Sequence, residues 1–341
     1  MTRATAASIR FDEGDLDLFA AASHDVNPLH RSGDYARRTA FGERVVFGVL
    51  GALAALGRLQ PREGRVLAKL SVEFAGPMFV GVDYAVDVDE SSPERAKVKV
   101  RDGRRVLLRL TARYRDGDVP DAPQWTAPLI ARTESADHAD EALVAGIAVQ
   151  GRYSAEPVAL AMLMVRHDLA ERGVGPRHAE ALLLASYLVG MELPGRRALF
   201  SDLSLDFEAE HSLSTAPVDW SLALDSVHPE FGMLSMSLAT TIEGVPAARA
   251  KLTAFARQEL PHLSPDAIES AAGRSERLLG KVALVTGASR GLGAAIAHAL
   301  ALHGCTVIGT YLSSSTEAEA LASRIASTPG SFIPMQGDAG D

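Results

Sequence analysis

The sequence predicts an α+β protein in which one helix-and-sheet unit occurs twice and is followed by a shorter α/β segment. Residues 45–57 are apolar almost all round, which is typical of a buried helix, and the strand-like stretches after them carry a hairpin signal at Asp102-Gly103. Short sequences from this region recur 133 residues later. Near the end, a strand-like run at 282–285 leads directly into a glycine-rich turn and an apolar-periodic helix.

The composition is that of a globular protein. The 341 residues are 47% hydrophobic and carry a formal net charge of −9, which favours two or three domains and argues against a general nucleic-acid binder. The single Cys305 excludes an internal disulfide framework and is expected in a core. Residues 1–9 lack the apolar region of a signal peptide, and no apolar run reaches the roughly 18 residues that span a bilayer. We therefore expect a cytoplasmic protein with no membrane partner.

Residues 1–118 are predicted to form the first unit. Its expected elements are a strand near 9–11, helices at 15–23 and 45–57, and strands at 67–74, 82–88, 97–100 and 106–114. The strands would form an antiparallel meander around the buried helix.

The loop between the two helices carries a candidate catalytic pair. Asp25 and His30 are five residues apart with Pro28 between them, and because proline lacks an N–H and clashes with the preceding turn, the pair cannot lie on one continuous helix. A bent loop is expected to present both side chains to one polar spot, which suits proton transfer. Asn27 is expected to brace this loop, and Ser32 to cap the short helix that follows.

The run D-x-N-P-x-H at 25–30, with Ala36, Phe41-Gly42 and a glycine early in the buried helix, resembles the MaoC-like dehydratases, the (R)-specific enoyl-CoA hydratases of the hot-dog fold. In that family the Asp and the His act on the substrate's water or hydroxyl and on its alpha proton, and the helix glycine donates its N–H to the thioester carbonyl. The resemblance implies these roles for Asp25, His30 and Gly48.

Two positions depart from the family pattern. Ser32 stands where the family usually has Asp, a conservative exchange at a cap, and Phe47 stands where it usually has a His, which bears on substrate fit more than on the chemistry. A cluster of arginines flanks the loop and is interpreted either as a landing site for the phosphates of coenzyme A or a carrier protein's phosphopantetheine, or as a solvated helix face. These arginines are Arg31, Arg37, Arg38 and Arg44.

A second unit, predicted at 140–258 after a proline-containing linker at 119–139, repeats the first. The matching pairs are 70–74 with 203–207 and 42–50 with 175–183, both at an offset of 133, and 109–112 with 251–254 at an offset of 142. The resemblance then implies a double hot-dog, a long buried helix wrapped by antiparallel sheet, twice.

At the start of the repeat, 11–18 aligns roughly with 153–160, again at an offset of 142, so about nine residues are missing from the second copy before Gly175, where the first copy carries its acid/histidine loop. The second copy should keep a helix at 179–191 and a sheet but no counterpart of that loop, so we expect it to wall the substrate site without catalysing. His167, His178 and Glu180 are substitutes on paper and are expected to be caps or surface residues.

The last segment, 279–341, follows a linker at 259–278 that contains a short helix at 265–272. A buried strand at 282–285 is expected to enter T-G-A-S-R-G-L-G, a helix at 294–303 and a strand at 306–310. Glycines at such a turn let the backbone approach a pyrophosphate and place it on the helix N-terminus. The motif resembles the T-G-x-x-x-G-x-G pattern of the short-chain dehydrogenase/reductases.

This second resemblance implies a cofactor site made of Gly287, Ser289, Arg290, Gly291, Gly293 and Asp338, the last matching the family's adenine-contacting Asp. No acid stands at 310–313, and Arg290 lies in the glycine turn, which favours NADP over NAD. The family's later strands, with its catalytic Ser and Tyr-x-x-x-Lys, are not in the sequence. We expect an incomplete, truncated α/β Rossmann-like segment of a longer polypeptide, without reductase activity in this chain.

The leading hypothesis is an acyl-thioester dehydratase/hydratase that interconverts (R)-3-hydroxyacyl and trans-2-enoyl thioesters of coenzyme A or acyl carrier protein and uses neither a cofactor nor a metal. One alternative is a non-catalytic acyl-binding or dimerisation module attached to a reductase. Another is a thioesterase, which would want an acid on the buried helix, where 45–57 has none. The acyl chain length, the carrier, the pathway, the proton assigned to each of Asp25 and His30, and homo-oligomerisation stay open.

Overall fold

The computed structural model divides the chain into two compact units, Met1–Gln258 and Glu259–Asp341. It describes residues 7–119, 132–208, 215–257, 264–312 and 314–337. Most of the predicted linker at 119–139 and the start of the one at 259–278 lie outside these described residues.

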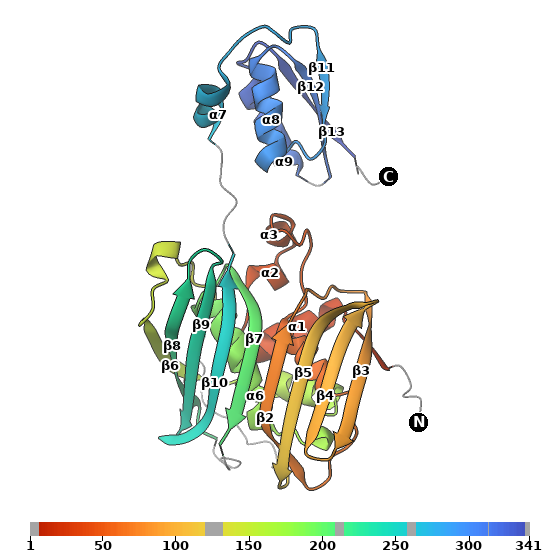
Figure 1. Ribbon diagram of the computed structural model, residues 1–341, viewed down its shortest axis with the longest axis vertical. Coiled ribbons are helices and arrows are strands. Elements are labelled where there is room, and N and C mark those ends of the chain that lie inside the picture. The colour runs from red at the N-terminus through yellow and green to blue at the C-terminus, as the bar shows by residue number, and fades with distance from the viewer. Residues whose placement is uncertain (1–6, 120–131, 209–214, 258–263, 313, 338–341) are drawn as a thin grey trace. The chain divides into compact units, whose positions relative to one another are not determined.

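The first unit contains two halves that share a main order of one strand, two longer helices and four strands (Figure 1). The first half comprises β1 (Ala7–Arg10), α1 (Glu13–Ser23), α2 (Pro28–Arg31), α3 (Gly33–Arg37), α4 (Gly48–Leu56), β2 (Arg65–Phe74), β3 (Asp83–Ser92), β4 (Arg95–Asp102) and β5 (Arg105–Asp116). The second half comprises a 3₁₀ turn (Asp140–Ala142), β6 (Ala148–Tyr153), α5 (Pro157–Arg166), a second 3₁₀ turn (Ala170–Arg172), α6 (Pro176–Tyr187) with a π-helical turn (Leu188–Glu192), β7 (Ala198–Phe207), β8 (Val218–His228), β9 (Met233–Ile242) and β10 (Val245–Ala256).

Helix α4 is shorter than predicted, because it begins at Gly48 and not at Val45. The preceding residues are held extended: Val45 forms an isolated β-bridge with Phe79, and the Val46 N–H donates to the Met78 carbonyl at 2.8 Å. Every residue of α4 after Gly48 is buried, as predicted.

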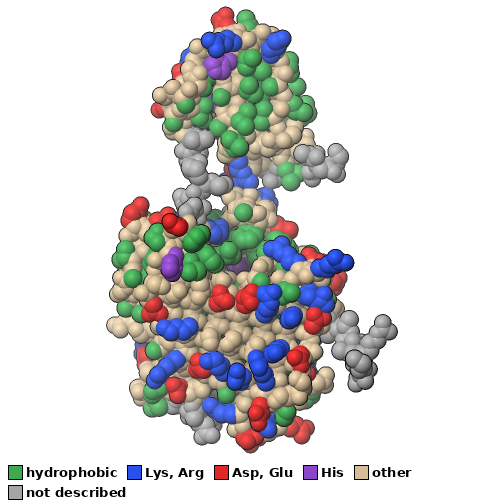
Figure 2. Space-filling model, in the orientation of Figure 1, with side chains coloured by type: hydrophobic (Ala, Val, Ile, Leu, Met, Phe, Trp, Pro, Cys, Tyr) green, Lys and Arg blue, Asp and Glu red, His purple; other side chains and the backbone are tan. Residues whose placement is uncertain are grey.

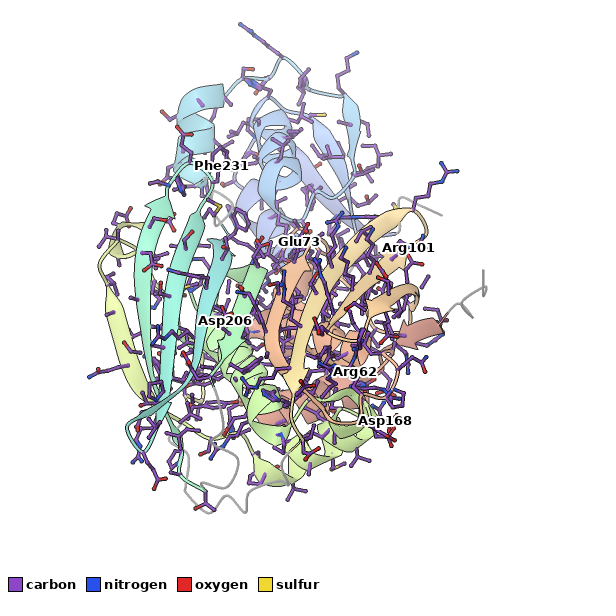
Figure 3. The ribbon with its side chains drawn as sticks, turned by 60° about the horizontal axis from the view of Figure 1, so that its bottom comes forward. Arg62, Glu73, Arg101, Asp168, Asp206 and Phe231 are labelled. Atoms are coloured by element: carbon purple, nitrogen blue, oxygen red, sulfur yellow. The ribbon has the colours of Figure 1, made fainter. Side chains whose placement is uncertain are left out.

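The two halves share one antiparallel sheet of ten strands in the order β1-β3-β4-β5-β2-β7-β10-β9-β8-β6. At its centre Ser71 of β2 lies opposite Ser204 of β7, its repeat counterpart (204 − 71 = 133), and their hydroxyl oxygens are 3.5 Å apart. Because equivalent residues face each other here, a pseudo-two-fold axis passes between the two strands. An ion pair from Lys69 to Asp206 at 2.8 Å crosses the same junction, where Figure 3 labels Glu73 and Asp206.

One hydrophobic core runs through both halves. Helix α1 contacts α5, and α4 contacts α6, so the helices of the two halves meet beneath the joined sheet. The outer face of the sheet carries basic and acidic side chains side by side (Figure 2). This is the α+β double hot-dog arrangement that the sequence predicts. Among the described residues, no helix combines the length and the apolar character that crossing a lipid bilayer requires.

The second unit contains α7 (Pro265–Ala272), β11 (Val282–Val285), α8 (Gly291–Leu302), β12 (Thr306–Tyr311), α9 (Ser315–Ile325) and β13 (Ser331–Gln336). Its parallel sheet has the order β11-β12-β13, and Cys305 is buried as predicted. The expectation of a buried first strand is wrong, because Val282 and Leu284 are each 66% exposed. In the part of this unit that the structure describes, β11 is an edge strand, and its outward-facing side chains have no helix over them.

Candidate active site

Asp25 and His30 lie on the wall of one cavity but on separate elements. His30 belongs to the one-turn helix α2 and not to a loop. Pro28 is compatible with this helix because it occupies the first turn, where a backbone N–H has no acceptor within the helix. The Asn27 side chain caps α2 by accepting the Leu29 N–H at 3.0 Å. Asp25 stands just before this cap, so a short segment ending in a helical turn presents both groups.

The cavity has a volume of about 300 Å³ and lies between the two halves. The first half lines it with Asp25, His30, Gly48 and Phe74, and the second half with Ser186, Val189, Gly190 and Phe200. The rings of Phe74 and Phe200 lie 5.0 Å apart, so an aromatic residue from each half contributes to the same wall. A mostly apolar cavity with a few convergent polar groups is the usual form of a small-molecule site.

The Asp25 carboxyl is 2% exposed and accepts two hydrogen bonds. The Ser186 hydroxyl donates to Oδ2 at 2.8 Å and the Asn27 N–H donates to Oδ1 at 3.1 Å. Burial disfavours the charged carboxylate and raises the pKa of Asp25 to about 6, while these two bonds act in the opposite direction. Asp25 is therefore able to change its protonation state close to neutral pH.

The second half holds the Asp25 segment in place. A Cβ atom added to Gly190 would lie 2.6 Å from Oδ1 of Asp25, so only glycine fits at this position of the π-helical turn. The Asn27 amide donates to the Gly190 carbonyl at 2.9 Å and to the Gly195 carbonyl at 3.0 Å. Sequence reasoning missed Gly190 and Ser186, and the repeat gave no signal for the serine, because the position 133 residues before Ser186 is a leucine.

His30 is held as a neutral imidazole. Its Nδ1 lies 2.7 Å from the Val45 carbonyl oxygen, and because a carbonyl only accepts, Nδ1 carries the hydrogen and Nε2 carries the lone pair. The ring stacks on Phe47 at 4.0 Å. Burial lowers the pKa of His30 to about 4, opposed by the Val45 carbonyl and assisted by the positive charge of Arg257. Phe47, which stands where the MaoC-like pattern usually has a histidine, therefore supports the His30 ring.

Gly48 is the first residue of α4 and lines the cavity. The first N–H groups of a helix have no acceptor within it, and the residue before Gly48 supplies no side-chain cap. The N–H groups at this helix start can therefore bind an oxygen of a ligand. A Cβ atom at Gly48 would lie 2.9 Å from the Phe74 ring, which explains why a glycine stands here.

The predicted cap at Ser32 is present, since its hydroxyl accepts the Tyr35 N–H at 3.2 Å and starts α3. Three arginines of the cluster beside the loop already pair with acids: Arg31 with Asp17, Arg37 with Asp34, and Arg44 with Glu13. These pairs favour the solvated-face interpretation for those three arginines over a dedicated phosphate site.

The second half lacks a free N–H group that corresponds to that of Gly48. Ala181 is the counterpart of Gly48 (181 − 48 = 133), but α6 begins five residues earlier, at Pro176, so the N–H of Ala181 lies inside the helix. His167 is the counterpart of Asp25 (167 − 25 = 142), and its backbone lies against Gly57 as Asp25 lies against Gly190. The loop that follows Asp25 has no equivalent there.

The other substitutes in the second half are bound into the structure. His178 accepts the Gly175 N–H at 2.9 Å and so caps the helix start, as expected. Glu180 is 0% exposed and pairs with Arg177, so the expectation of a cap or surface residue is wrong for this glutamate. A buried carboxyl at this point is tolerated because the Ala155 N–H also donates to it, at 3.2 Å.

The glycine turn of the second unit has a tight backbone geometry that depends on its glycines. Gly287 and Gly291 have positive φ angles of 64° and 57°, and a Cβ atom at Gly293 would lie 2.3 Å from the Gly287 carbonyl oxygen. Ser289 and Arg290 complete the turn into α8. Asp338 lies outside the described residues. Within the described ranges there is no group of three or more His, Cys, Asp or Glu side chains that could hold a metal ion.

Two family models match parts of the chain. Residues 1–108 match the MaoC like domain, and residues 281–341 match the short chain dehydrogenase. The first match contains Asp25, His30 and Gly48, and the second contains the glycine turn.

Curated relatives fall into the same two groups. An (R)-specific enoyl-CoA hydratase of Rhodospirillum rubrum is 37% identical over 94 residues, which are 26% of this chain and 65% of that protein. The versicolorin reductase stcU of Emericella nidulans is 51% identical over 65 residues, 19% of this chain and 25% of that protein. The chain thus spans just under two thirds of the hydratase and a quarter of the reductase.

Solved structures show the fold of the first unit. A MaoC-like dehydratase superimposes with a TM-score of 0.55 at 10% identity and covers 73% of this chain and 96% of that one. A putative MaoC domain protein dehydratase from Chloroflexus aurantiacus gives a TM-score of 0.54 at 12% identity, over 74% of this chain and 94% of that one. Both matches are long enough to include the two halves.

The pKa values of Asp25 and His30 predict opposite effects on stability. The Asp25 pKa rises from 3.8 to about 6, so between these values the folded state binds more protons than the unfolded state and stability falls as pH rises. The His30 pKa falls from 6.5 to about 4, so the folded state binds fewer protons there and stability rises with pH. Each effect is worth about 3 kcal/mol, and in the wild type they nearly cancel.

Asp25→Asn removes the first effect. As pH rises from 4 to 6.5, the free energy of unfolding of Asp25→Asn should therefore increase by about 3 kcal/mol, whereas that of the wild type stays nearly constant. The free energy of unfolding of His30→Gln should decrease by a similar amount over the same pH range. Urea unfolding followed by tryptophan fluorescence measures this, since the buried Trp220 lies in the first unit and reports its unfolding. A wild-type pH dependence in Asp25→Asn would show that the carboxyl has an ordinary pKa.

Proposed function

We propose that this chain, which carries a MaoC-like segment at residues 1–108 and a short-chain dehydrogenase segment at 281–341, interconverts (R)-3-hydroxyacyl and trans-2-enoyl thioesters. The observation that carries the proposal is the content of one cavity between the halves. It holds a carboxyl whose pKa is near 6, a neutral imidazole with a free lone pair, and a helix start with available N–H groups. Addition of water across a conjugated thioester needs an acid, a base and a stabilised enolate oxygen.

In the hydration direction the structure favours distinct roles for the two groups. His30 Nε2 takes a proton from the attacking water, because Nδ1 is already committed to the Val45 carbonyl. The hydroxyl oxygen bonds to the beta carbon, and the electron pair of the double bond moves to the thioester oxygen, where the Gly48 N–H stabilises it. Protonated Asp25 then delivers a proton to the alpha carbon. Dehydration runs through the same steps in reverse.

The second half supports this site without a catalytic loop of its own. Ser186 and Gly190 fix the Asp25 carboxyl, and Val189 and Phe200 extend the apolar wall on the side where an acyl chain would lie. We propose coenzyme A or an acyl carrier protein as the carrier of the thioester; the name of the Rhodospirillum rubrum hydratase supports coenzyme A.

The short-chain dehydrogenase segment extends the proposal to a dehydratase-ketoreductase polypeptide, in which a 3-ketoacyl group is reduced before it is dehydrated. Its glycine turn fits the pyrophosphate of a dinucleotide at the start of α8, and Arg290 in that turn supports NADP. When bound, NADPH supplies the hydride that converts a 3-ketoacyl group into the 3-hydroxyacyl group on which the first unit would act. Ser289, Gly291 and Gly293 would hold its phosphates, and Asp338 its adenine.

The decisive experiment is hydration of crotonyl-CoA by the purified chain. We expect loss of the enoyl-thioester absorbance and formation of the (R)-3-hydroxy product. Asp25→Asn and His30→Ala should each lower kcat/KM by at least about a hundredfold, and the double variant by little more, since the two groups act in one step. A folded wild-type protein that hydrates neither coenzyme A nor carrier-protein esters would favour the non-catalytic acyl-binding module instead.

The pH profile tests the assignment of roles. Hydration requires protonated Asp25 and neutral His30, so kcat/KM should be highest between about pH 4 and 6, falling above as Asp25 ionises and below as His30 protonates. Steady-state rates at pH 4 to 9 measure this. A rate that rises through pH 6 to a plateau would make ionised Asp25 the base and reverse the assignment.

Gly48 allows a test of the helix N–H on its own. Proline is well tolerated at the first position of a helix, and the ψ angle of 128° at the preceding Phe47 suits a following proline. Gly48→Pro therefore deletes this donor, and Gly48→Ala adds a similar crowding of Phe74 while keeping the N–H. We expect kcat for Gly48→Pro to be about a hundredfold below that for Gly48→Ala. Equal kcat values would remove Gly48 from the catalytic step.

A further inference from the structure

The second half has a cavity of its own, with a volume of about 160 Å³, at the start of α6 and the ends of β5 and β7. It is the repeat counterpart of the proposed active site. Lining positions of the two cavities that correspond at an offset of 133 include Val45 with His178, Gly48 with Ala181, Phe74 with Phe207, and Val66 with Leu199. The half without the acid/histidine loop therefore still has a pocket at the equivalent place, and no step of the proposed reaction uses it.

One part of the wall of this pocket is apolar, while charged and polar side chains line the rest. Phe207, Leu184 and Val218 are buried and line the apolar part, together with Ile242 and Ala248 from the neighbouring strands. Its volume is about half that of the first cavity. The apolar part suits a short aliphatic chain, because transfer of such a chain from water is favourable and needs no polar partner.

An arginine stands at the mouth of the pocket. Arg115, near the end of β5, is the counterpart of Arg257, which follows β10 (257 − 115 = 142). Each arginine belongs to one half and its charge acts on a histidine of the other, Arg257 on His30 and Arg115 on His178. At both sites the charge of an arginine in one half therefore acts on a histidine of the other half, and Arg115 in addition lines the second cavity.

Arg115 is placed to receive an anion. Its guanidinium donates to the main-chain carbonyls of Phe207 at 3.3 Å and of Glu208 at 3.5 Å, both near the limit for a hydrogen bond. The acids around it have other partners: Asp116 pairs with Arg65, Glu208 with Arg249 and Glu180 with Arg177, while Asp118 lies exposed on the rim. Among the described residues, Arg115 therefore has no carboxylate of its own.

His178 adds a neutral donor at the same place. Its Nδ1 accepts the Gly175 N–H, so the hydrogen of the neutral ring is on Nε2. Burial lowers the pKa of His178 to about 4, which keeps the ring neutral at physiological pH. The ring meets Phe207 edge-on at 4.5 Å, and so stands where the polar mouth joins the apolar wall.

We propose that this cavity is a second, non-catalytic binding site for a short aliphatic carboxylate, with the chain against Phe207 and Leu184 and the carboxylate oxygens at Arg115 and His178. A guanidinium and an N–H donor match the two acceptor oxygens of a carboxylate. The preference for an acyl-type chain rests on the proposed function, while the pocket and its arginine do not.

Calorimetric titration with hexanoate tests the proposal on the full chain. The titration is run in the presence of saturating butyryl-CoA, which occupies the first cavity and cannot react because it lacks both the double bond and the hydroxyl. We expect one equivalent of hexanoate to bind. Arg115→Gln should weaken binding at least about tenfold, and the matched control Arg115→Lys, which keeps the charge, should weaken it clearly less.

Filling the pocket gives a second test. Ala181→Phe places a ring in the cavity and should abolish hexanoate binding, while crotonyl-CoA hydration stays within about twofold of wild type, because Ala181 lines only the second cavity. Thermal unfolding checks that the variant is folded. If Ala181→Phe is unfolded, the comparison of Arg115→Gln with Arg115→Lys alone tests the proposal.

The proposal is overturned if butyryl-CoA blocks hexanoate, or if hexanoate binds equally to wild type, Arg115→Gln and folded Ala181→Phe. Hexanoate binding that depends on Arg115 in a chain that fails to hydrate crotonyl-CoA would uphold this site and reject the proposed reaction. Hydration of crotonyl-CoA by a chain that shows no Arg115-dependent binding of hexanoate would uphold the proposed reaction and reject this site.

Discussion

The structure of the first unit depends on the pairing of β2 with β7. These two central strands join five strands from each half into one sheet and place Ser71 opposite Ser204 on a pseudo-two-fold axis. With the sheet continuous, α4 and α6 must lie side by side beneath it. That neighbourhood is what brings the π-helical turn after α6 against the segment that contains Asp25.

The symmetry is broken where chemistry is proposed. Nine extra residues in the first half form the segment with Asp25 and His30. In the second half, α6 begins five residues before the position that corresponds to the start of α4. The first change adds an acid and a base, and the second removes the free N–H at the equivalent helix start. Burial then gives the carboxyl a higher pKa than the imidazole, because it raises the pKa of the carboxyl and lowers that of the imidazole. A carboxyl and an imidazole in water would have the reverse order.

Most of the fold could be read from local patterns and from the repeat. The apolar run at 45–57, the turn at Asp102-Gly103 and the 133-residue offset were sufficient to predict the two halves, whereas the pairing of β2 with β7 was not predicted. The start of α4 was predicted three residues too early, because the bridge from Val45 to Phe79 depends on a residue 34 positions further along the chain (79 − 45 = 34). The exposure of β11 was missed for the same kind of reason, since an apolar run says nothing about its neighbours.

The candidate site was only half readable. Asp25, His30 and Gly48 lie in short motifs, and the structure brings them to one cavity. Ser186 and Gly190 lie more than 150 residues away in sequence (186 − 25 = 161) and have no polar counterpart in the first half. Their contribution comes from tertiary contact alone. The buried Glu180 was likewise unreadable, because its ion pair and its main-chain donor become visible only after α6 packs against the rest of the unit.

The fusion of the two halves has a consequence for how such a site can diverge. In a pair of identical chains, any exchange at the position of Gly190 would also occur at its symmetry mate, and both sites would have to tolerate it. Here Gly190 contacts Asp25 while its counterpart Gly57 contacts His167, so a mutation strikes one environment only. The covalent link therefore lets the two cavities drift apart in sequence under separate selection, although they remain tied to one axis and one core.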